Sequence, residues 1–199
     1  DSRHLHQLFN NMQKLFENFR KYLQEARKQA ADVGYVLVDD GGEDFIRIVL
    51  YEDRENLGKL GNIYLALLDW EEDEKDQSID CGSDVWVVAD VHAQDGFGPL
   101  LYDIALEYIY NERRGVMMSG GHGETTGNVT VEAAKVWQFY FKNRSDVHKD
   151  KDPRCSDILS PWILENPQLK PYHEALMHVY YKDEDVVLDL EREDKIEYR

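Results

Sequence analysis

The stretch that decides the fold is VWVVADVHAQDGFGPLLYDIALEYI, residues 85–109. It opens with a nearly continuous apolar run at residues 85–91, which is typical of a central strand covered on both faces. A tight loop with two glycines follows at residues 92–98. A helix is predicted at residues 99–112, because proline suits the first helical position and the apolar residues after it recur at helical spacing. A strand, a loop and a helix in direct succession predict part of a βαβ unit.

The segments on either side of this stretch predict a single mixed sheet. Alternating or continuous apolar runs bounded by turn residues indicate strands. Such runs occupy residues 35–38, 45–51, 62–70, 115–119 and 174–182. A second helix is predicted at residues 131–143, where Thr130 can cap the first turn, and the proline-containing residues 144–171 are expected to be irregular. The order predicts an α+β or mixed α/β domain, with a central mixed sheet flanked by helices.

The chain divides into three segments. Residues 34–183 form the main domain, and residues 184–199 are expected to be a charged tail or an edge strand. Within residues 1–33, apolar side chains recur every three or four positions over residues 4–31, which predicts an extra N-terminal amphipathic helix. Its apolar stripe either packs on the sheet of the same chain or mediates self-association or contact with a protein partner.

Charge and composition exclude several functional classes. The 199 residues contain 40 acidic and 23 basic side chains, for a formal charge of -17. Such a field repels phosphate backbones and anionic membranes, so no direct nucleic-acid binding and no membrane contact are expected. No apolar run reaches the roughly 18 residues that a membrane span needs. The same charge attracts cationic amines and basic peptides, or it serves solubility alone.

The remaining composition points to an intracellular protein without a metal. Cys81 and Cys155 make no disulfide framework, which favours a cytoplasmic setting. The acidic run at residues 71–76 lacks the spacing and the glycine of an EF-hand loop. No metal ligands are therefore predicted.

The glycine loop before the second half of the stretch has a specific physical use. Gly96 and Gly98 can adopt backbone angles that other residues avoid, and they let the main chain approach a ligand closely. The first N–H groups of the following helix have no partners within the helix. Together with the helix dipole they favour an anion such as a pyrophosphate. A strand-to-helix turn also needs glycine for geometry alone, so a purely structural role remains open.

This arrangement resembles the GNAT superfamily of acetyl-CoA-dependent N-acyltransferases. That family carries a strand, then a Gln/Arg-x-x-Gly-x-Gly/Ala loop, then a helix. In this chain the corresponding residues are AQDGFG at 93–98, where both glycines match and Ala93 stands in place of Gln or Arg. The runs at residues 96–107, 129–137 and 143–147 also resemble GNAT-like domains encoded by bacteriophages, some of them attached to virion proteins. The resemblance covers roughly residues 60–182.

The resemblance implies a GNAT-like fold, acetyl-CoA as the cofactor and an amine as the acceptor. It places the thioester carbonyl near the main chain of the central strand and the pyrophosphate on the loop. The implied cofactor-binding residues are Val91, Ala93, Gln94, Asp95, Gly96, Phe97, Gly98, Thr130 and Trp137.

Catalysis in this family uses a base for the amine and often a tyrosine that protonates the departing thiolate. The matching position counted from Thr130 is Trp137, and Tyr140 lies one turn further along the helix. Asp90 and His92 follow the central strand, where ligands bind in open sheets, and they are the candidate bases. Each has a structural alternative: Tyr140 as a core aromatic residue, Asp90 as a loop cap and His92 as a surface residue.

Three functions therefore follow from the sequence. The first is an acetyl-CoA-dependent N-acyltransferase of the bacterial cytoplasm, for which the resemblance implies a phage genome as one source. The second is a catalytically inactive GNAT fold that serves as a virion structural or protein-interaction module. The third is an acidic inhibitor of a host nucleic-acid-binding protein.

Overall fold

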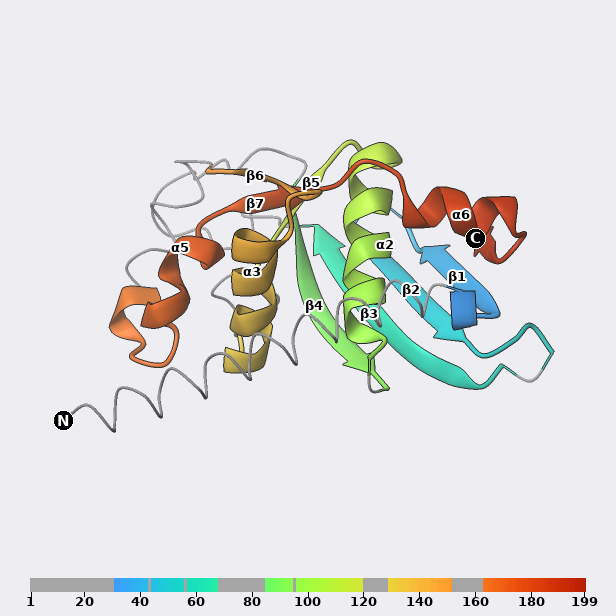
Figure 1. The fold of residues 1–199 in the computed structure, drawn as a ribbon, viewed down its shortest axis with the longest axis horizontal. Helices are drawn as coiled ribbons and strands as arrows, with labels where there is room; N and C mark the ends of the chain where they lie inside the picture. Colours follow the sequence, from blue (N-terminus) through green and yellow to red (C-terminus); the bar gives the residue numbers. More distant parts are fainter. Residues whose placement is uncertain are drawn as a thin grey trace.

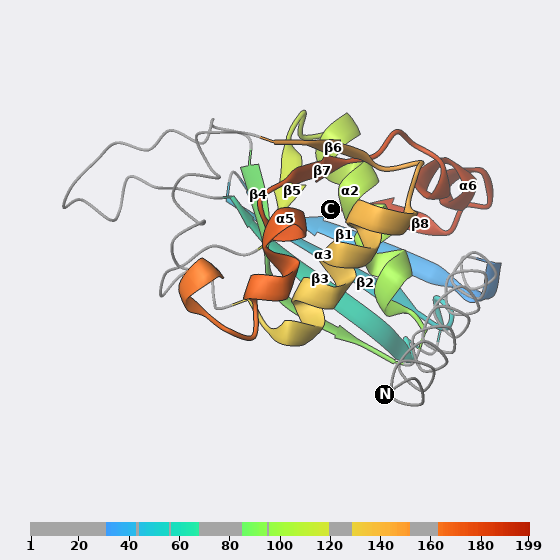
Figure 2. The same cartoon turned by 60° about the vertical axis from the view of Figure 1, so that its left-hand side comes forward.

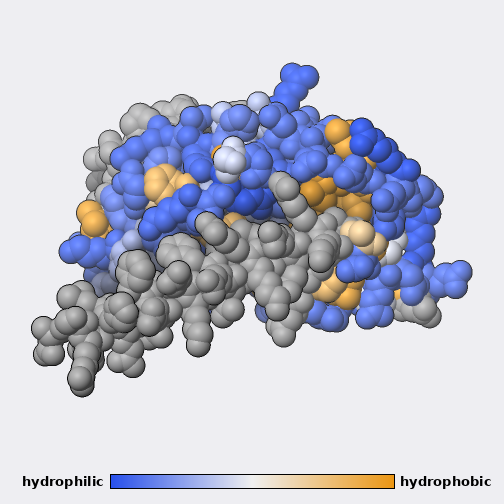
Figure 3. All heavy atoms as spheres, in the orientation of Figure 1, coloured by the Kyte–Doolittle hydropathy of each residue, from blue (hydrophilic) through white to orange (hydrophobic). Residues whose placement is uncertain are grey.

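The computed structural model describes residues 31–42, 44–55, 57–67, 85–94, 96–119, 129–151 and 163–199. The helix predicted at residues 4–31 lies almost wholly outside these ranges. Both cysteines, the acidic run at 71–76 and Asp95 lie outside them as well. On the face drawn in Figure 3 the described residues are mostly hydrophilic, with hydrophobic side chains in smaller patches.

The described residues form one mixed sheet in the order β6-β7-β5-β4-β3-β2-β1-β8 (Figure 1). The strands are β1 (Tyr35–Asp40), β2 (Phe45–Tyr51), β3 (Lys59–Leu67), β4 (Val85–Ala93), β5 (Val116–Met118), β6 (His148–Asp150), β7 (Val179–Tyr181) and β8 (Ile196–Tyr198). Neighbours from β1 to β4 are antiparallel, whereas β4 pairs with β5 in parallel. The predicted mixed sheet flanked by helices is confirmed.

Helix α2 (Gly98–Asn111) lies against one face of the sheet, and α3 (Val131–Asn143) packs beside it (Figures 1 and 2). As predicted, the Thr130 hydroxyl accepts a hydrogen bond from the N–H of Ala133 at 3.1 Å and caps α3. Two shorter helices, α5 (His173–Leu176) and α6 (Val186–Arg192), follow in the C-terminal part.

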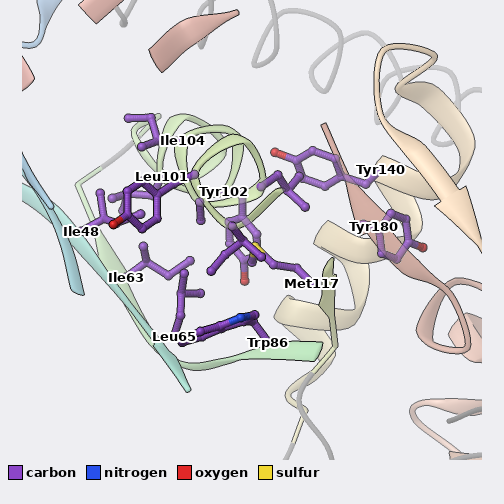
Figure 4. Packing of buried hydrophobic residues seen from close by; sticks show 14 of the residues in the cluster. Ile48, Ile63, Leu65, Trp86, Leu101, Tyr102, Ile104, Met117, Tyr140 and Tyr180 are labelled. Atoms are coloured by element: carbon purple, nitrogen blue, oxygen red, sulfur yellow. The ribbon is translucent and has the colours of Figure 1, made fainter. Parts of the chain in front are cut away.

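Helix α2 is the centre of the core. Every residue from Pro99 to Ile109 is buried, so the helix is covered on all sides and not only along the one apolar face that its sequence predicts. Figure 4 shows Ile48, Ile63 and Trp86 reaching from the strands toward this helix. Burying each such side chain contributes about 1.5–3 kcal/mol.

Glu107 joins this helix to the C-terminal part of the chain. Its side chain is fully buried on α2 and forms an ion pair with Lys182, which follows β7. Its carboxylate also accepts hydrogen bonds from the N–H groups of Asp185, Val186 and Val187 at 3.1, 3.1 and 2.7 Å. These N–H groups belong to the start of α6, so Glu107 caps that helix from a distant part of the sequence.

The structure corrects two predictions in the C-terminal third and refines another. Residues 174–182 were expected to be one strand, but α5 ends at Leu176 and only β7 is extended. The region expected to be irregular contains β6, which pairs with β7. Residues 184–199, expected as a charged tail or an edge strand, contain the short helix α6 and then β8, which is the edge strand beside β1. Both β6 and α6 depend on distant partners, which local patterns do not reveal.

Replacing Glu107 tests its anchoring role. Glu107→Gln should lower the free energy of unfolding by about 3–5 kcal/mol, because it removes the anionic acceptor of three backbone N–H groups and leaves the buried Lys182 with the more distant carboxylate of Asp185, at 3.6 Å. Urea denaturation measures the loss. The matched variant Glu112→Gln, at the exposed end of the same helix, should change stability by less than about 0.5 kcal/mol. Equal effects for the two variants would contradict the role assigned to Glu107.

Candidate functional site

Strand β4 is paired on both sides only at its beginning. On the β5 side the pairing covers Val85 to Val87, and it stops because β5 ends at Met118. On the other side β3 stays paired with β4 as far as Ala93. The second half of β4 therefore presents an open main-chain edge toward the β5 side, within the part of the chain that the structure describes (Figure 1).

Exposure changes at the same point along the strand. Val85, Trp86 and Val87 are buried, as expected for a central strand, but Ala89, Asp90, His92 and Ala93 are exposed. The register with β3 shifts between Tyr64 and Leu65, which indicates a β-bulge near Ala89. A bulge bends a strand and redirects its side chains. The prediction that the whole strand is covered on both faces is thus correct only for its first half.

Asp90 and His92 project from the same face of β4, because they are two residues apart on a strand. The Nε2 atom of His92 lies 3.2 Å from Oδ2 of Asp90, and their side chains are 77% and 51% exposed. Their cross-strand partners are Tyr64 and Asn62. The structure therefore brings both candidate bases together as one accessible pair beside the open edge.

The loop after β4 leads directly into α2. Gly96 has a φ of 91°, a conformation that favours glycine. The N–H of Gln94 donates to the carbonyl of Leu60 at 2.8 Å, and the N–H of Phe97 donates to the carbonyl of Gln94 at 3.1 Å. These two groups, expected at the anion site, are used within the protein.

Three other backbone N–H groups lie in this loop and in the first turn of α2. In the described residues, the N–H groups of Gly96, Gly98 and Leu100 donate to no backbone carbonyl outside the helix. Phe97 occupies the N-cap position of α2, and its side chain forms no capping hydrogen bond. Val91 and Ala93 lie on the open half of β4, so the open strand edge and the helix start are joined by one short loop.

Trp137 and Tyr140 are separated from this surface. Both side chains are 1% exposed in the core. The Trp137 ring packs on Tyr180, with ring centroids 4.8 Å apart. The hydroxyl of Tyr140 donates to Oδ1 of Asp103 at 2.8 Å. This placement favours the structural interpretation of both aromatic residues.

The neighbours of Tyr140 reinforce this conclusion. Asp103 also accepts two hydrogen bonds from Arg144, at 2.9 and 3.1 Å. Burial raises the pKa of Tyr140 well above its usual value, and the charge of Asp103 raises it further. Hydrogen bonding to Arg144 lowers the pKa of Asp146 to about 2. A hydroxyl that is this hard to ionise and already donates to a carboxylate holds α2 against α3.

Thr130 lies at the opposite end of α3 from Tyr140. Ten residues of helix separate the two, which corresponds to about 15 Å. Beside Thr130 is an open pocket of about 710 Å³, lined by residues 129–132, 166–169, 171 and 172. The structure thus groups the β4 and loop residues but leaves Thr130 with its capping role.

Three polar residues that no sequence pattern singled out lie on the same face of the sheet as Asp90 and His92. Arg47, Asn62 and Tyr64 come from β2 and β3, and each interrupts an apolar strand. The available signal was a polar residue between buried neighbours, as in the sequence FIRIVLY of β2.

Comparisons with protein-family models, with curated proteins and with solved structures found no match to this chain. Among the described residues, no helix is long and apolar enough to span a membrane. The same residues contain no group of three or more His, Cys, Asp or Glu side chains suited to hold a metal ion. Any functional conclusion therefore depends on the geometry around β4.

Removing the Tyr140 hydroxyl tests its structural role. Tyr140→Phe should lower the free energy of unfolding by about 1 kcal/mol, because Asp103 loses one buried hydrogen bond but keeps Arg144. Tyr181→Phe, which removes an exposed hydroxyl bonded to Asp150, is the matched control and should change stability by less than about 0.5 kcal/mol. Urea denaturation of both variants decides the matter, and an unchanged Tyr140→Phe would argue against a structural role.

Proposed function

We propose that this chain is a GNAT-like N-acyltransferase that transfers an acetyl group from acetyl-CoA to an amine. One observation carries the proposal: the open edge of β4 continues through a glycine loop into a helix start without a side-chain cap. A ligand such as acetyl-CoA has an extended arm that leads to a pyrophosphate. The arm would lie along the open strand edge, and the pyrophosphate would lie at the helix start. The strand, loop and helix are the elements on which the resemblance to the GNAT superfamily depends.

The residues present fit acetyl-CoA. Main-chain groups of Val91 and Ala93 on the open edge of β4 would hold the arm that bears the acyl group. The N–H groups of Gly96, Gly98 and Leu100, aided by the dipole of α2, would hold the pyrophosphate. A helix start of this kind binds phosphate without a basic side chain, so Ala93 in place of Gln or Arg is compatible with the proposal.

The chemistry is acyl transfer from a thioester. Acetyl-CoA would supply an activated acyl carbon, to which the amine nitrogen forms a C–N bond while the C–S bond breaks. The sulfur leaves as a thiol, which takes up the proton that the nitrogen loses when it becomes an amide. The protein contributes mainly by holding the two reactants in register. Asp90 and His92, 3.2 Å apart beside the open edge, would accept the proton that the ammonium group must lose before it attacks.

Tyr140 and Trp137 have no catalytic role in this proposal, because both are buried in the core. The alternative of an inactive fold in a virion predicts a protein without affinity for acetyl-CoA. The N-terminal helix that motivates that alternative lies outside the described residues.

Calorimetric titration with acetyl-CoA tests the proposal. The wild-type protein should bind with a micromolar Kd, and Gly98→Val should weaken binding at least about tenfold, because a side chain blocks the close approach of the ligand to the main chain. Gly41→Val is the matched control, since an added Cβ there meets only Phe45 O at 3.8 Å.

Thermal denaturation checks that both variants fold. Absence of binding by the folded wild-type protein would exclude the acyltransferase. Binding that is equal in wild type and Gly98→Val would show that the loop is a structural turn.

A further inference from the structure

The sheet face opposite α2 carries a row of polar side chains across four strands. The register aligns Asp39 with Arg47, Arg47 with Tyr64, and Tyr64 with Asp90. Residues directly opposite one another in antiparallel strands share a face. Their sequence neighbours Ile48 and Ile63 point toward α2 (Figure 4), so this row points away from it.

A second row lies beside the first. It aligns Val49 with Asn62 and Asn62 with His92. Asn62 is 2% exposed although it is polar. The two rows together place Arg47, Asn62, Tyr64, Asp90 and His92 on one face, and we name these five residues the β-face cluster.

Two atoms of the β-face cluster are buried without hydrogen-bond partners: Nε of Arg47 and Oδ1 of Asn62. Within the described residues they are the buried side-chain polar atoms in this condition. A buried donor or acceptor without a partner costs about 1–3 kcal/mol, and such groups are rare in folded proteins. One donor and one acceptor without partners on adjacent strands are the kind of exception to core packing that functional sites carry.

Arg47 determines what one end of that ligand carries. Its guanidinium carbon lies 5.2 Å from the centroid of the Tyr64 ring, so the cation extends over β3 toward β4. It forms no ion pair with a described carboxylate, Asp39 on the neighbouring strand included. A partly buried guanidinium that is held over an aromatic ring and pairs with none of the described carboxylates is suited to bind the carboxylate of a ligand.

The other end of the cluster has the opposite character. Asp90 and His92 lie on the strand next to Tyr64, and neighbouring strands are about 4.8 Å apart. The Asp90 carboxylate attracts an ammonium group. The cluster thus presents a site for an anion and a site for a cation within about one to two strand spacings of each other.

We infer that the β-face cluster binds a small aminocarboxylate, with its carboxylate on Arg47 and its ammonium group on Asp90 and His92. This inference rests on the proposed acyltransferase function in one respect: the bound aminocarboxylate is then the acyl acceptor, because its nitrogen lies beside the open edge of β4. Arg47 is the residue that determines specificity.

Calorimetric titration without acetyl-CoA tests the site directly. The ligands are β-alanine, γ-aminobutyrate and ε-aminocaproate, which vary the spacing between the charges, together with hexylamine and hexanoate, which each carry one charge. At least one aminocarboxylate should bind about tenfold or more tightly than hexylamine or hexanoate, because it forms two charge-assisted contacts. Equal or absent binding across the whole set would overturn the inference.

Arg47→Met is the decisive variant, since it keeps the length of the side chain over Tyr64 and removes the unpartnered donor. The ratio of affinities for the best aminocarboxylate and hexylamine should fall about tenfold. The thermal midpoint should stay the same or rise, because a buried unsatisfied atom is lost. Arg54→Met is the control, since Arg54 also lies over a tyrosine ring, 5.1 Å from the centroid of Tyr35; it should leave the ratio unchanged. A lower thermal midpoint with an unchanged ratio in Arg47→Met would assign Arg47 to the fold alone.

The two proposals fail separately. If acetyl-CoA binds but the affinity ratio is the same in wild type and Arg47→Met, the aminocarboxylate site is wrong and the acyltransferase stands. If the ratio falls but acetyl-CoA does not bind, the site stands as a binding site and the acyltransferase is wrong.

Discussion

The structure depends most on the buried carboxylate of Glu107. It lies on the most buried helix and joins Lys182 to the first N–H groups of α6. Near the other end of the same helix, Asp103 joins Tyr140 to Arg144. Because a buried charge is tolerated only with full compensation, these two anchors fix α2 relative to α3 and the C-terminal strands. The position of the helix start, and with it the candidate site, follows from these contacts.

Strand β4 carries the surface on which the proposed ligands would bind. Its first half completes the core through Val85, Trp86 and Val87, whereas its second half is open on the side of β5. An open strand edge inside a sheet is a ready partner for an extended chain. The same strand presents Asp90 and His92 on the face away from α2, so one element serves both the proposed acyl donor and the proposed acceptor.

The β-face cluster also explains why the sheet is not fully apolar. Arg47 and Asn62 occupy positions where an aliphatic residue would pack without an unsatisfied atom. Stability alone does not favour them, and functional sites are where such exceptions are expected. The net negative charge of the chain does not conflict with the proposed binding of a carboxylate by Arg47. Selectivity for the aminocarboxylate would come from the local arrangement of the β-face cluster and not from the net charge.

The sequence by itself determined the strand–loop–helix unit around the glycine loop, the bounds of β2 and α3, and the cap at Thr130. These depend on local periodicity and on hydrogen bonds within a few residues. Asp90 and His92 were identified because they lie at the end of a predicted central strand. Three features depend on tertiary contacts: the burial of Tyr140 and Trp137 in the core, the capping of α6 by Glu107, and the open edge along the second half of β4. The tertiary structure also aligned Asn62 with His92 and placed Arg47 on the same face as Asp90, two strands away, because cross-strand register joins residues that no local pattern connects.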